Sequence, residues 1–381
     1  MFTARTKRGK ASSMGPVVSL DARTLGATGL GTYTGELLEN FASLDHHEFR
    51  FRVLCTKPEL MEKFPLEKFE FVPTAAPIYS IKEQWEVMRT ARGGDLLHCT
   101  HYNIPYFHTG RMVVTIHDLT HLTHPEFLPN RLAYYYARFM LSAAAQRARQ
   151  VITVSQFSKQ SICEILGVPE EKVHVIPFGL PRRSAESKPL DGIQLEKLGI
   201  VRPYVLFVGL LKPHKNVQAL LRAFACLPEQ IRCSHRLVIA GKLGSYYPTL
   251  SRVSAELQLQ DRVQFTGQVS DEELHALYAG AKAFVLPSLN EGFGLPALEA
   301  MSYGLPVIVS NTSSLPEVVG NAGMLVDPTD DRSIALAIEA VLADSDLRRK
   351  LSALSRERAK AFSAKEFARQ HLEVYREALR N

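Results

Sequence analysis

The sequence predicts an α/β protein made of two doubly wound domains, each built on a parallel sheet. Three observations lead to this fold class. The chain has 381 residues, more than one hydrophobic core of ordinary size requires. Short β-branched and apolar runs alternate with segments of helical periodicity throughout. One stretch, residues 181–202, is rich in proline, serine and charge, and it separates two halves of similar size.

The strands are expected where the short apolar runs lie, and several runs are apolar throughout, which is typical of strands buried on both faces of a parallel sheet. In the first half these are Val17–Leu20, Phe51–Cys55, Phe69–Val72, Leu96–Cys99, Val113–Ile116, Val151–Val154 and Val173–Ile176. In the second half they are Tyr204–Val208, Leu237–Ala240, Val263–Phe265, Ala283–Leu286, Val307–Val309 and Met324–Val326.

Helices are expected between these strands, at Asn216–Leu227, Glu272–Ala279, Pro296–Tyr303 and, at the end, the amphipathic segment Phe362–Leu379. The chain therefore divides into a first domain over residues 14–190, a second domain over 200–355 and a closing helix over 356–381.

The composition is that of a soluble globular protein, with 46% hydrophobic and 22% charged residues. No apolar run reaches the roughly 18 residues that a membrane-spanning helix needs. The net charge of +6 comes mostly from residues 1–13, which hold Arg5, Lys7, Arg8 and Lys10 and no acid. Without them the balance is near neutral, so no nucleic-acid face is indicated.

This basic leader lacks the apolar core of a secretory signal. We expect a disordered tail or a true start at Met14, and an organellar transit peptide is the remaining alternative. The five cysteines are odd in number, scattered and without a CxxC pair. They indicate a reducing, cytoplasmic compartment, with neither disulfides nor a zinc site.

The most informative stretch is Asn290–Tyr303, NEGFGLPALEAMSY, which follows the strand-like AFVLPS. Pro296 suits the first turn of a helix. The amides of Phe293, Gly294 and Leu295 would then point out of the helix N-terminus and make a phosphate site, which the bare backbone of Gly294 lets an anion approach.

Two carboxylates flank this predicted phosphate site, Glu291 before the helix and Glu299 within it. Because like charges repel, we expect them to accept hydrogen bonds from ribose or sugar hydroxyls. Stabilisation of a helix dipole is the structural alternative. A glycosidase pair is disfavoured, because about two helical turns separate the two acids.

A second phosphate-compatible loop is Gly209–Asn216, GLLKPHKN, directly after the strand YVLFV. Lys215 and Lys212 are the candidates to neutralise a leaving diphosphate, and an exposed surface lysine is the alternative, above all for Lys212. The loop is neither GxGxxG nor a P-loop, so a nicotinamide or P-loop function is not supported. The glycine-rich Gly26–Gly35, placed before an expected helix at Glu36–Phe41, fits a tight turn as well as a ligand loop.

His117 ends the strand VVTI, where α/β proteins place functional groups. A structural histidine is the alternative. His121 and His124 follow it, but a metal-protease motif needs a helix with glutamate beside the first histidine, so no metal is predicted. Asp344-Ser345-Asp346 matches the DxD triplet of metal-bound nucleotides, yet it lies at a charged helix junction and is expected to be a solvated cap.

Together these segments resemble the family 4 glycosyltransferases, retaining enzymes of the GT-B fold, from about Val17 to Leu379. EGFGLPALEAMSYGLPVIVSNTSSLPEVVGNAGMLVDP is similar to the family's E-x7-E donor-binding segment, and VGLLKPHKN to its phosphate-clamp loop. VVTIHD resembles the strand that presents a histidine near the reacting sugar. GLGTYTGELLENF resembles the Gly-rich loop by the acceptor and diphosphate, here Gly29 and Gly31.

The resemblance implies two Rossmann-like domains that face each other across a cleft, with the last helix crossing back to the first domain. The first domain would bind the acceptor and the second a nucleotide diphosphate sugar. Glu299 would accept from ribose hydroxyls and Glu291 from the donor sugar, with His117 beside it. Lys215, Gly209 and the helix amides would hold the diphosphate, and backbone near Val269 would read the base. Domain closure would gate a reaction that needs no metal or other cofactor.

Two positions depart from the family pattern. Leu210 stands where many members have arginine, and Lys212 or His214 would have to supply charge. Ala364 replaces a tryptophan in the closing segment, which affects packing.

The resemblance suggests GDP-mannose as donor, with a UDP-hexose as the rival, and a glycan, lipid-linked or small-molecule acceptor. A phosphorylase-like enzyme lacks a suggestive pyridoxal lysine, and a non-catalytic sugar-nucleotide module is the further alternative. Residues 131–150 combine aromatic and basic side chains, which fits a buried helix or, as the alternative, contact with the membrane surface. The sequence does not indicate an oligomeric state.

Overall fold

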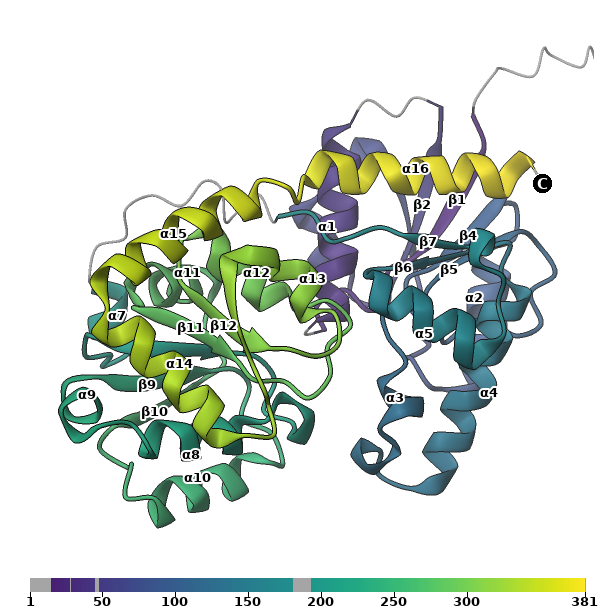
Figure 1. Cartoon of the computed structure of the whole chain (residues 1–381). Coiled ribbons are helices and arrows are strands. Elements are labelled where there is room, and N and C mark those ends of the chain that lie inside the picture. The colour runs from purple at the N-terminus through teal and green to yellow at the C-terminus, as the bar shows by residue number, and fades with distance from the viewer. Residues whose placement is uncertain (1–14, 28, 45–47, 181–192, 381) are drawn as a thin grey trace, which may run out of the picture.

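The computed structural model describes residues 15–27, 29–44, 48–180 and 193–380. It confirms the predicted fold class, because two domains with central parallel sheets lie beside each other (Figure 1). The expected basic leader, residues 1–13, lies outside the described residues. So does most of the expected domain boundary, at residues 181–192.

The first domain holds a seven-stranded parallel sheet of order β3-β2-β1-β4-β5-β6-β7. Its strands are β1 Val17–Asp21, β2 Arg50–Cys55, β3 Phe69–Pro73, β4 Leu96–Cys99, β5 Met112–Thr115, β6 Gln150–Thr153 and β7 Val173–Val175. Its helices are α1 Leu30–Ser43, α2 Ile81–Thr90, α3 Thr120–Thr123, α4 Arg131–Arg147 and α5 Gln156–Leu166. Short 3₁₀ helices are η1 Pro58–Lys63, η2 Leu66–Lys68, η3 Pro125–Phe127 and η4 Glu170–Lys172.

The second domain holds a six-stranded parallel sheet of order β10-β9-β8-β11-β12-β13. Its strands are β8 Tyr204–Val208, β9 Arg236–Ala240, β10 Val263–Gly267, β11 Ala283–Leu286, β12 Val307–Ser310 and β13 Gly323–Val326. Its helices are α7 Ile193–Lys197, α8 Val217–Ala225, α9 Glu229–Ser234, α10 Tyr247–Glu256, α11 Asp271–Gly280, α12 Leu295–Ser302, α13 Leu315–Val319, α14 Asp331–Ala343 and α15 Ser345–Ala359, with 3₁₀ helices η5 Pro213–Lys215 and η6 Gly320–Ala322.

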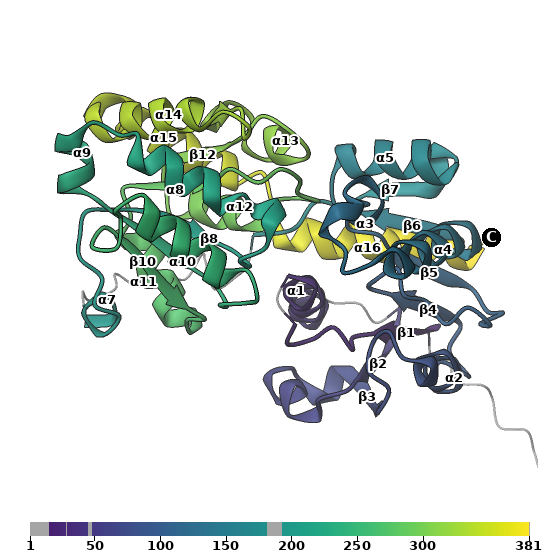
Figure 2. The same cartoon turned by 90° about the horizontal axis from the view of Figure 1, so that it is seen from below.

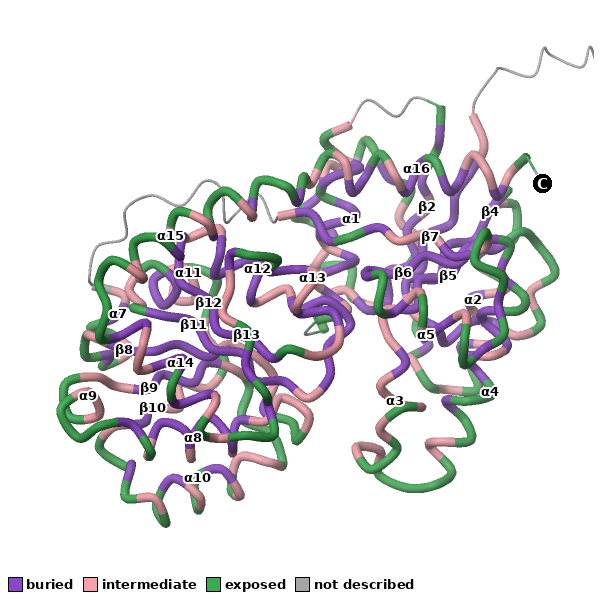
Figure 3. Tube along the Cα trace, in the orientation of Figure 1, coloured by how far each residue is buried: buried purple, intermediate pink, exposed green. Residues whose placement is uncertain are grey.

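Every expected strand is present. The strands β11 and β12 are buried along their whole length, as Figure 3 shows, which explains why Ala283–Leu286 and Val307–Val309 are apolar without alternation.

The last helix, α16 Ala364–Arg380, leaves the second domain and packs against α1 of the first (Figure 1). The end of the first domain and the segment that leads into α16 lie side by side, because the Leu180 amide donates to the Phe362 carbonyl at 2.8 Å. One apolar cluster continues across this junction and includes Phe178, Phe362 and Phe367. The segment expected as one closing helix is therefore the end of α15 followed by α16.

The structure corrects one local expectation. The helix expected at Glu36 begins at Leu30, with Gly29 as its N-cap at φ 78°, so half of the glycine-rich segment is helical. In Figures 1 and 2, α1 lies between the first-domain sheet and the second domain. The expectation for Asp344 is confirmed, because its carboxylate caps α15 by accepting from the amides of Asp346 and Leu347.

Candidate active site

A cleft of about 740 Å³ separates the two domains and is lined by loops that follow strands of both sheets. This volume lies in the range of small-molecule sites. All predicted site residues but one line it, namely Gly29, Gly31, His117, Gly209, Lys215, Val269, Glu291, Phe293, Gly294, Leu295 and Glu299. Lys212 does not line the cleft and is exposed to solvent.

The N-terminus of α12 opens into this cleft. Gly294 caps the helix at φ 96°, and a β-carbon there would lie 2.4 Å from Cδ2 of Leu315, so both the backbone conformation and the packing require glycine. Pro296 occupies the first turn. Within the described part of the chain, the amides of Phe293, Gly294 and Leu295 have no hydrogen-bond acceptor. These donors are available to an anion.

Lys215 and Glu291 form an ion pair in the cleft. The Lys215 ammonium donates to both carboxylate oxygens, at 2.7 and 2.8 Å, and the Ser288 hydroxyl donates to one of them at 2.7 Å. Both side chains are mostly buried. An ammonium has three protons, so Lys215 keeps one for a ligand while it holds Glu291 in place.

Glu299 is 8% exposed and accepts a hydrogen bond from the Tyr278 hydroxyl at 2.9 Å. Tyr278 stacks on Tyr303, with ring centroids 5.4 Å apart, so the hydroxyl has a fixed direction. The sequence gives no signal for Tyr278, because nothing in the pattern of α11 relates that residue to a carboxylate 21 positions later.

His117 lies two residues beyond the end of β5, and its Nε2 is 3.0 Å from the Thr100 carbonyl. Because a carbonyl only accepts, Nε2 carries the proton. Burial lowers the pKa of His117, so the ring is neutral at pH 7 and its Nδ1 can accept a hydrogen bond.

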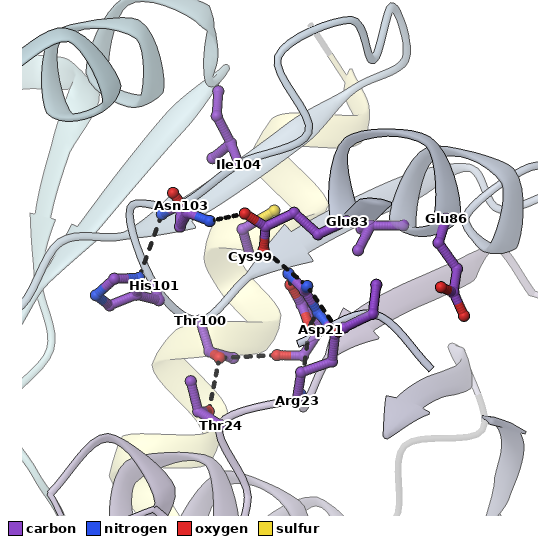
Figure 4. Close-up of polar contacts among 12 residues, drawn as sticks. Asp21, Arg23, Thr24, Glu83, Glu86, Cys99, Thr100, His101, Asn103 and Ile104 are labelled. Carbon is purple, nitrogen blue, oxygen red and sulfur yellow. Dashed lines mark hydrogen bonds and ion pairs between the residues drawn. The ribbon is translucent and has the colours of Figure 1, made fainter. Parts of the chain in front are cut away.

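A buried network of Asp21, Arg23, Glu83 and Thr100, drawn in Figure 4, was not predicted. The Arg23 guanidinium donates to both oxygens of Asp21, at 2.8 and 2.7 Å, and to Glu83 at 2.8 Å. The Thr100 hydroxyl donates to the Asp21 carbonyl at 2.8 Å. Thr100, which accepts from His117, is thereby fixed to the carboxyl end of β1. Asp21 directly follows the predicted strand Val17–Leu20 and ends β1, which is the signal that could have located this network.

Asn103 and Tyr136 extend this network toward the surface. Asn103 donates to Glu83 and accepts from the Tyr136 hydroxyl of α4. Burial raises the pKa of Glu83 above its ordinary value.

The loop between β11 and α12, residues 287–294, contacts the first domain directly, and we call it the donor loop. A β-carbon on Gly292 would lie 2.7 Å from the His117 carbonyl and 3.0 Å from the Asp118 carboxylate. Asn290 donates to the Thr120 hydroxyl at 2.6 Å. Glu317 of α13 accepts from the first amides of α5 at 3.0 and 3.3 Å. The two domains are therefore closed upon each other at this edge of the cleft.

Leu210 lines the cleft where the family resemblance implies arginine. His214 does not supply the missing charge, because burial and the neighbouring Lys215 lower its pKa to about 3. Lys242, after β9, and Lys63, from η1, also line the cleft. These two lysines were not predicted, since neither belongs to a recognisable motif.

Within residues 15–27, 29–44, 48–180 and 193–380, no three His, Cys, Asp or Glu side chains group as metal ligands. His121 pairs with the Tyr102 hydroxyl and His124 with Glu126, so the three histidines of the motif serve different contacts. None of the helices formed by these described residues has the length and apolar character that crossing a bilayer requires.

A helix N-terminus, a lysine and two buried carboxylates in an interdomain cleft define a two-domain α/β protein suited to a phosphorylated, hydroxyl-bearing ligand. Residues 27–182 match the model of glycosyltransferase family 4, and residues 194–358 match that of the glycosyl transferases group 1. The chain belongs to glycosyltransferase family 4, and it is a hexosyltransferase.

Two relatives named as mannosyltransferases are similar over about 70% of the chain. O-antigen chain mannosyltransferase B of Escherichia coli is 34% identical over 272 residues, which are 70% of this chain and 70% of the relative. O-antigen chain mannosyltransferase RfbU of Salmonella typhimurium is 32% identical over 267 residues, 69% of this chain and 70% of the relative.

Solved structures share the fold at low sequence identity. Sucrose-phosphate synthase from Thermosynechococcus elongatus has a TM-score of 0.77 and 23% identity, covering 95% of this chain and 98% of that one. Anabaena HepE in complex with UDP-glucose has a TM-score of 0.79 and 20% identity, covering 95% and 100%. These structures confirm the GT-B arrangement that the resemblance implied.

Proposed function

We propose that the protein transfers mannose from GDP-mannose to a hydroxyl of a glycan or lipid-linked acceptor, with retention of the anomeric configuration. The observation that carries this proposal is the convergence of the α12 amides, the Lys215–Glu291 pair and Glu299 in one cleft. Two relatives are named as mannosyltransferases, and the match covers about 70% of each of them. Their names support the choice of sugar.

In the proposed complex the diphosphate lies against the amides of Phe293, Gly294 and Leu295, and the free proton of Lys215 reaches it. Glu299 accepts from the ribose, and Glu291 accepts from hydroxyls of the donor sugar. Backbone near Val269 contacts the base, and Gly29, Gly31 and Gly209 leave room for the phosphates and the acceptor.

For the chemical step, we assign no protein carboxylate as nucleophile, because Glu291 is already engaged by Lys215 and Ser288. The incoming hydroxyl forms the new glycosidic bond as the bond to the diphosphate breaks, and its proton passes to the leaving phosphate oxygen. The neutral His117 accepts a hydrogen bond from a sugar hydroxyl at Nδ1 and thereby orients the donor. Lysine and helix amides supply the positive field that a divalent cation supplies elsewhere, so metal is not required.

The donor is tested by thermal shift with GDP, UDP, GDP-mannose and UDP-glucose, because a ligand bound by the native state alone raises Tm. We expect GDP and GDP-mannose to raise Tm most. A larger shift with the uridine ligands would assign a UDP-hexose donor instead, the class present in the HepE structure. Turnover of GDP-mannose should persist in EDTA, and the one-bond coupling between the anomeric carbon and its proton in the product, read by NMR, should report the same anomeric configuration as in the donor.

We also propose a cytoplasmic enzyme that binds an anionic membrane surface peripherally through α4. This helix is not wholly buried, because it exposes Leu132, Tyr135, Tyr136 and Phe139. It carries three arginines and no acidic residue, which suits anionic headgroups. Free cysteines in the described residues fit a reducing compartment.

Co-sedimentation tests the membrane proposal. The protein should pellet with vesicles that contain phosphatidylglycerol and remain in solution with pure phosphatidylcholine. The double substitution Tyr135→Ser and Phe139→Ser should abolish pelleting, whereas Leu336→Ser, which changes an exposed apolar residue of the second domain, should not. Pelleting that is unaffected by the α4 substitutions would refute this surface.

A further inference from the structure

Five polar side chains form one hydrogen-bonded chain inside the first domain, behind the cleft. They come from α1, β4, β5 and α16, and each is 0% exposed: Tyr33, His98, Thr115, His371 and Tyr375. Their successive donor–acceptor distances are 2.6 Å for Tyr375–His98, 2.9 Å for His98–Thr115, 2.9 Å for Thr115–Tyr33 and 2.6 Å for Tyr33–His371. The proposed reaction makes no direct use of these groups.

One backbone carbonyl fixes the direction of every proton in this network. Nδ1 of His371 lies 2.7 Å from the Phe367 carbonyl, which only accepts, so Nδ1 is the donor. Burial lowers the pKa of His371 to about 4, so the ring is neutral and its Nε2 accepts from the Tyr33 hydroxyl. The Tyr33 oxygen is left to accept from Thr115.

The same logic continues to the far end of the network. Thr115 donates to Tyr33 and therefore accepts from Nε2 of His98. Burial lowers the pKa of His98 as well, so its ring is neutral and Nδ1 accepts from the Tyr375 hydroxyl. Each buried polar group has the partner that its chemistry demands, so the network has a single arrangement.

Tyr33 connects this network to the cleft. Its ring meets the imidazole of His117 edge to face, with centroids 4.7 Å apart and an interplanar angle of 87°. His117 is thus held by the Thr100 carbonyl at Nε2 and by the Tyr33 ring against its side. The hydroxyl of Tyr33 is anchored from behind by Thr115 and by His371 of α16.

The rings around Tyr33 also reach the donor loop. The ring centroid of Phe178 lies 5.5 Å from that of Tyr33 and 5.1 Å from that of Phe293. The ring centroid of Phe367, in α16, lies 5.6 Å from that of Tyr33. Phe293 supplies one of the amides at the α12 N-terminus. The Tyr33 ring therefore lies where α16, the segment that carries Phe178 and the donor loop with Phe293 meet.

We propose that α16 positions the imidazole of His117 through Tyr33, so that Tyr33 and His371 are positioning residues for glycosyl transfer. The inference rests on the proposed function in one respect, that His117 faces the donor sugar. Without the two hydrogen bonds on its hydroxyl, the Tyr33 ring can shift and the imidazole with it. A displacement of about 1 Å at such a group can cost on the order of 100-fold in rate.

The test compares two substitutions that each delete one hydroxyl of the same network. Tyr33→Phe removes the anchor beside His117. Tyr375→Phe removes the hydroxyl at the other end and leaves both bonds of Tyr33 in place. Each leaves one histidine nitrogen without its donor, and Tyr33→Phe also leaves the Thr115 hydroxyl without its acceptor, so both should lower Tm, Tyr33→Phe by more.

We expect Tyr33→Phe to lower kcat about tenfold or more, with the Kd for nucleotide and the KM for donor within twofold of wild type. Tyr375→Phe should keep kcat within twofold. Equal losses of kcat in the two variants, or an unchanged kcat in Tyr33→Phe, would overturn the proposal.

A spectroscopic readout separates this proposal from the proposed function. In protein labelled with ¹⁵N-histidine, Tyr33→Phe should shift the ring resonances of His117, whereas Tyr375→Phe should leave them in place. This arm stands even if the wild-type chain transfers no sugar from any nucleotide tested, an outcome that would refute the proposed function. Unshifted His117 resonances in Tyr33→Phe would refute the positioning role.

Discussion

The Lys215 ammonium donates to both carboxylate oxygens of Glu291, across 76 positions of sequence. A lysine expected to touch phosphate and a glutamate expected to touch sugar are thus one unit. The pair gives a buried carboxylate a cationic partner, and it leaves the remaining lysine proton for a ligand in the cleft.

Lys215→Ala should therefore remove a phosphate donor and leave Glu291 buried beside an empty space. We expect kcat to fall about 100- to 1000-fold, the range seen when one charge-stabilising donor is removed, and the Kd for GDP to rise. Lys212→Ala is the matched control, because that lysine lies three residues earlier on the same loop, exposed and outside the cleft. Similar steady-state kinetics for the two variants would contradict the assignment of Lys215.

Glu299→Gln tests the proposed ribose contact with little change in shape. The Tyr278 hydroxyl can still donate to the amide oxygen, so the fold should persist. The loss of a charged acceptor should weaken binding of GDP about tenfold, in line with the 1.5–3 kcal/mol of hydrogen bonds to charged groups. Calorimetric titration with GDP and with 2′-deoxy-GDP measures this. If the variant bound GDP as tightly as wild type does, the ribose role would be wrong.

Much of the fold could be predicted because most strands are short, largely apolar runs that alternate with helical segments, so local pattern and burial agree. The cleft residues could be named because Glu291, Gly294 and Glu299 belong to one short motif. The motif cannot report partners from distant segments. Arg23, which fixes Thr100 behind His117, and Tyr278 lie in ordinary α/β sequence, and their roles arise only when the strand ends meet.

The stability of the fold should fall in mild acid because of His371. Its pKa is about 4 in the folded protein and about 6.5 when unfolded, so the unfolded chain binds more protons between these values. The contribution is complete above about pH 6.5 and is lost as pH falls toward 4, on the order of 3 kcal/mol. His98 acts in the same direction.

Urea unfolding at pH 7.0 and pH 4.5 measures this loss of stability. The variant His371→Gln has no titrating ring at that position, so it should be less stable than wild type at pH 7.0 but lose less stability between the two pH values. Parallel pH profiles for wild type and variant would show that His371 is not a source of the acid sensitivity.

Gly292 offers the sharpest test of domain closure. A methyl group there would lie 2.7 Å from the His117 carbonyl and 3.0 Å from the Asp118 carboxylate, closer than carbon and oxygen atoms approach without displacement. Both are parts of the first domain, whereas the nucleotide contacts belong to the second. Gly292→Ala should therefore leave the Kd for GDP nearly unchanged and lower kcat at least tenfold, because closure completes the site.

Gly244→Ala, at a position with open space around it, is the control and should behave as wild type. Small-angle scattering with GDP bound should give a larger radius of gyration for Gly292→Ala than for Gly244→Ala. Equal radii together with equal kcat would mean that the contact between Gly292 and His117 does not control the reaction.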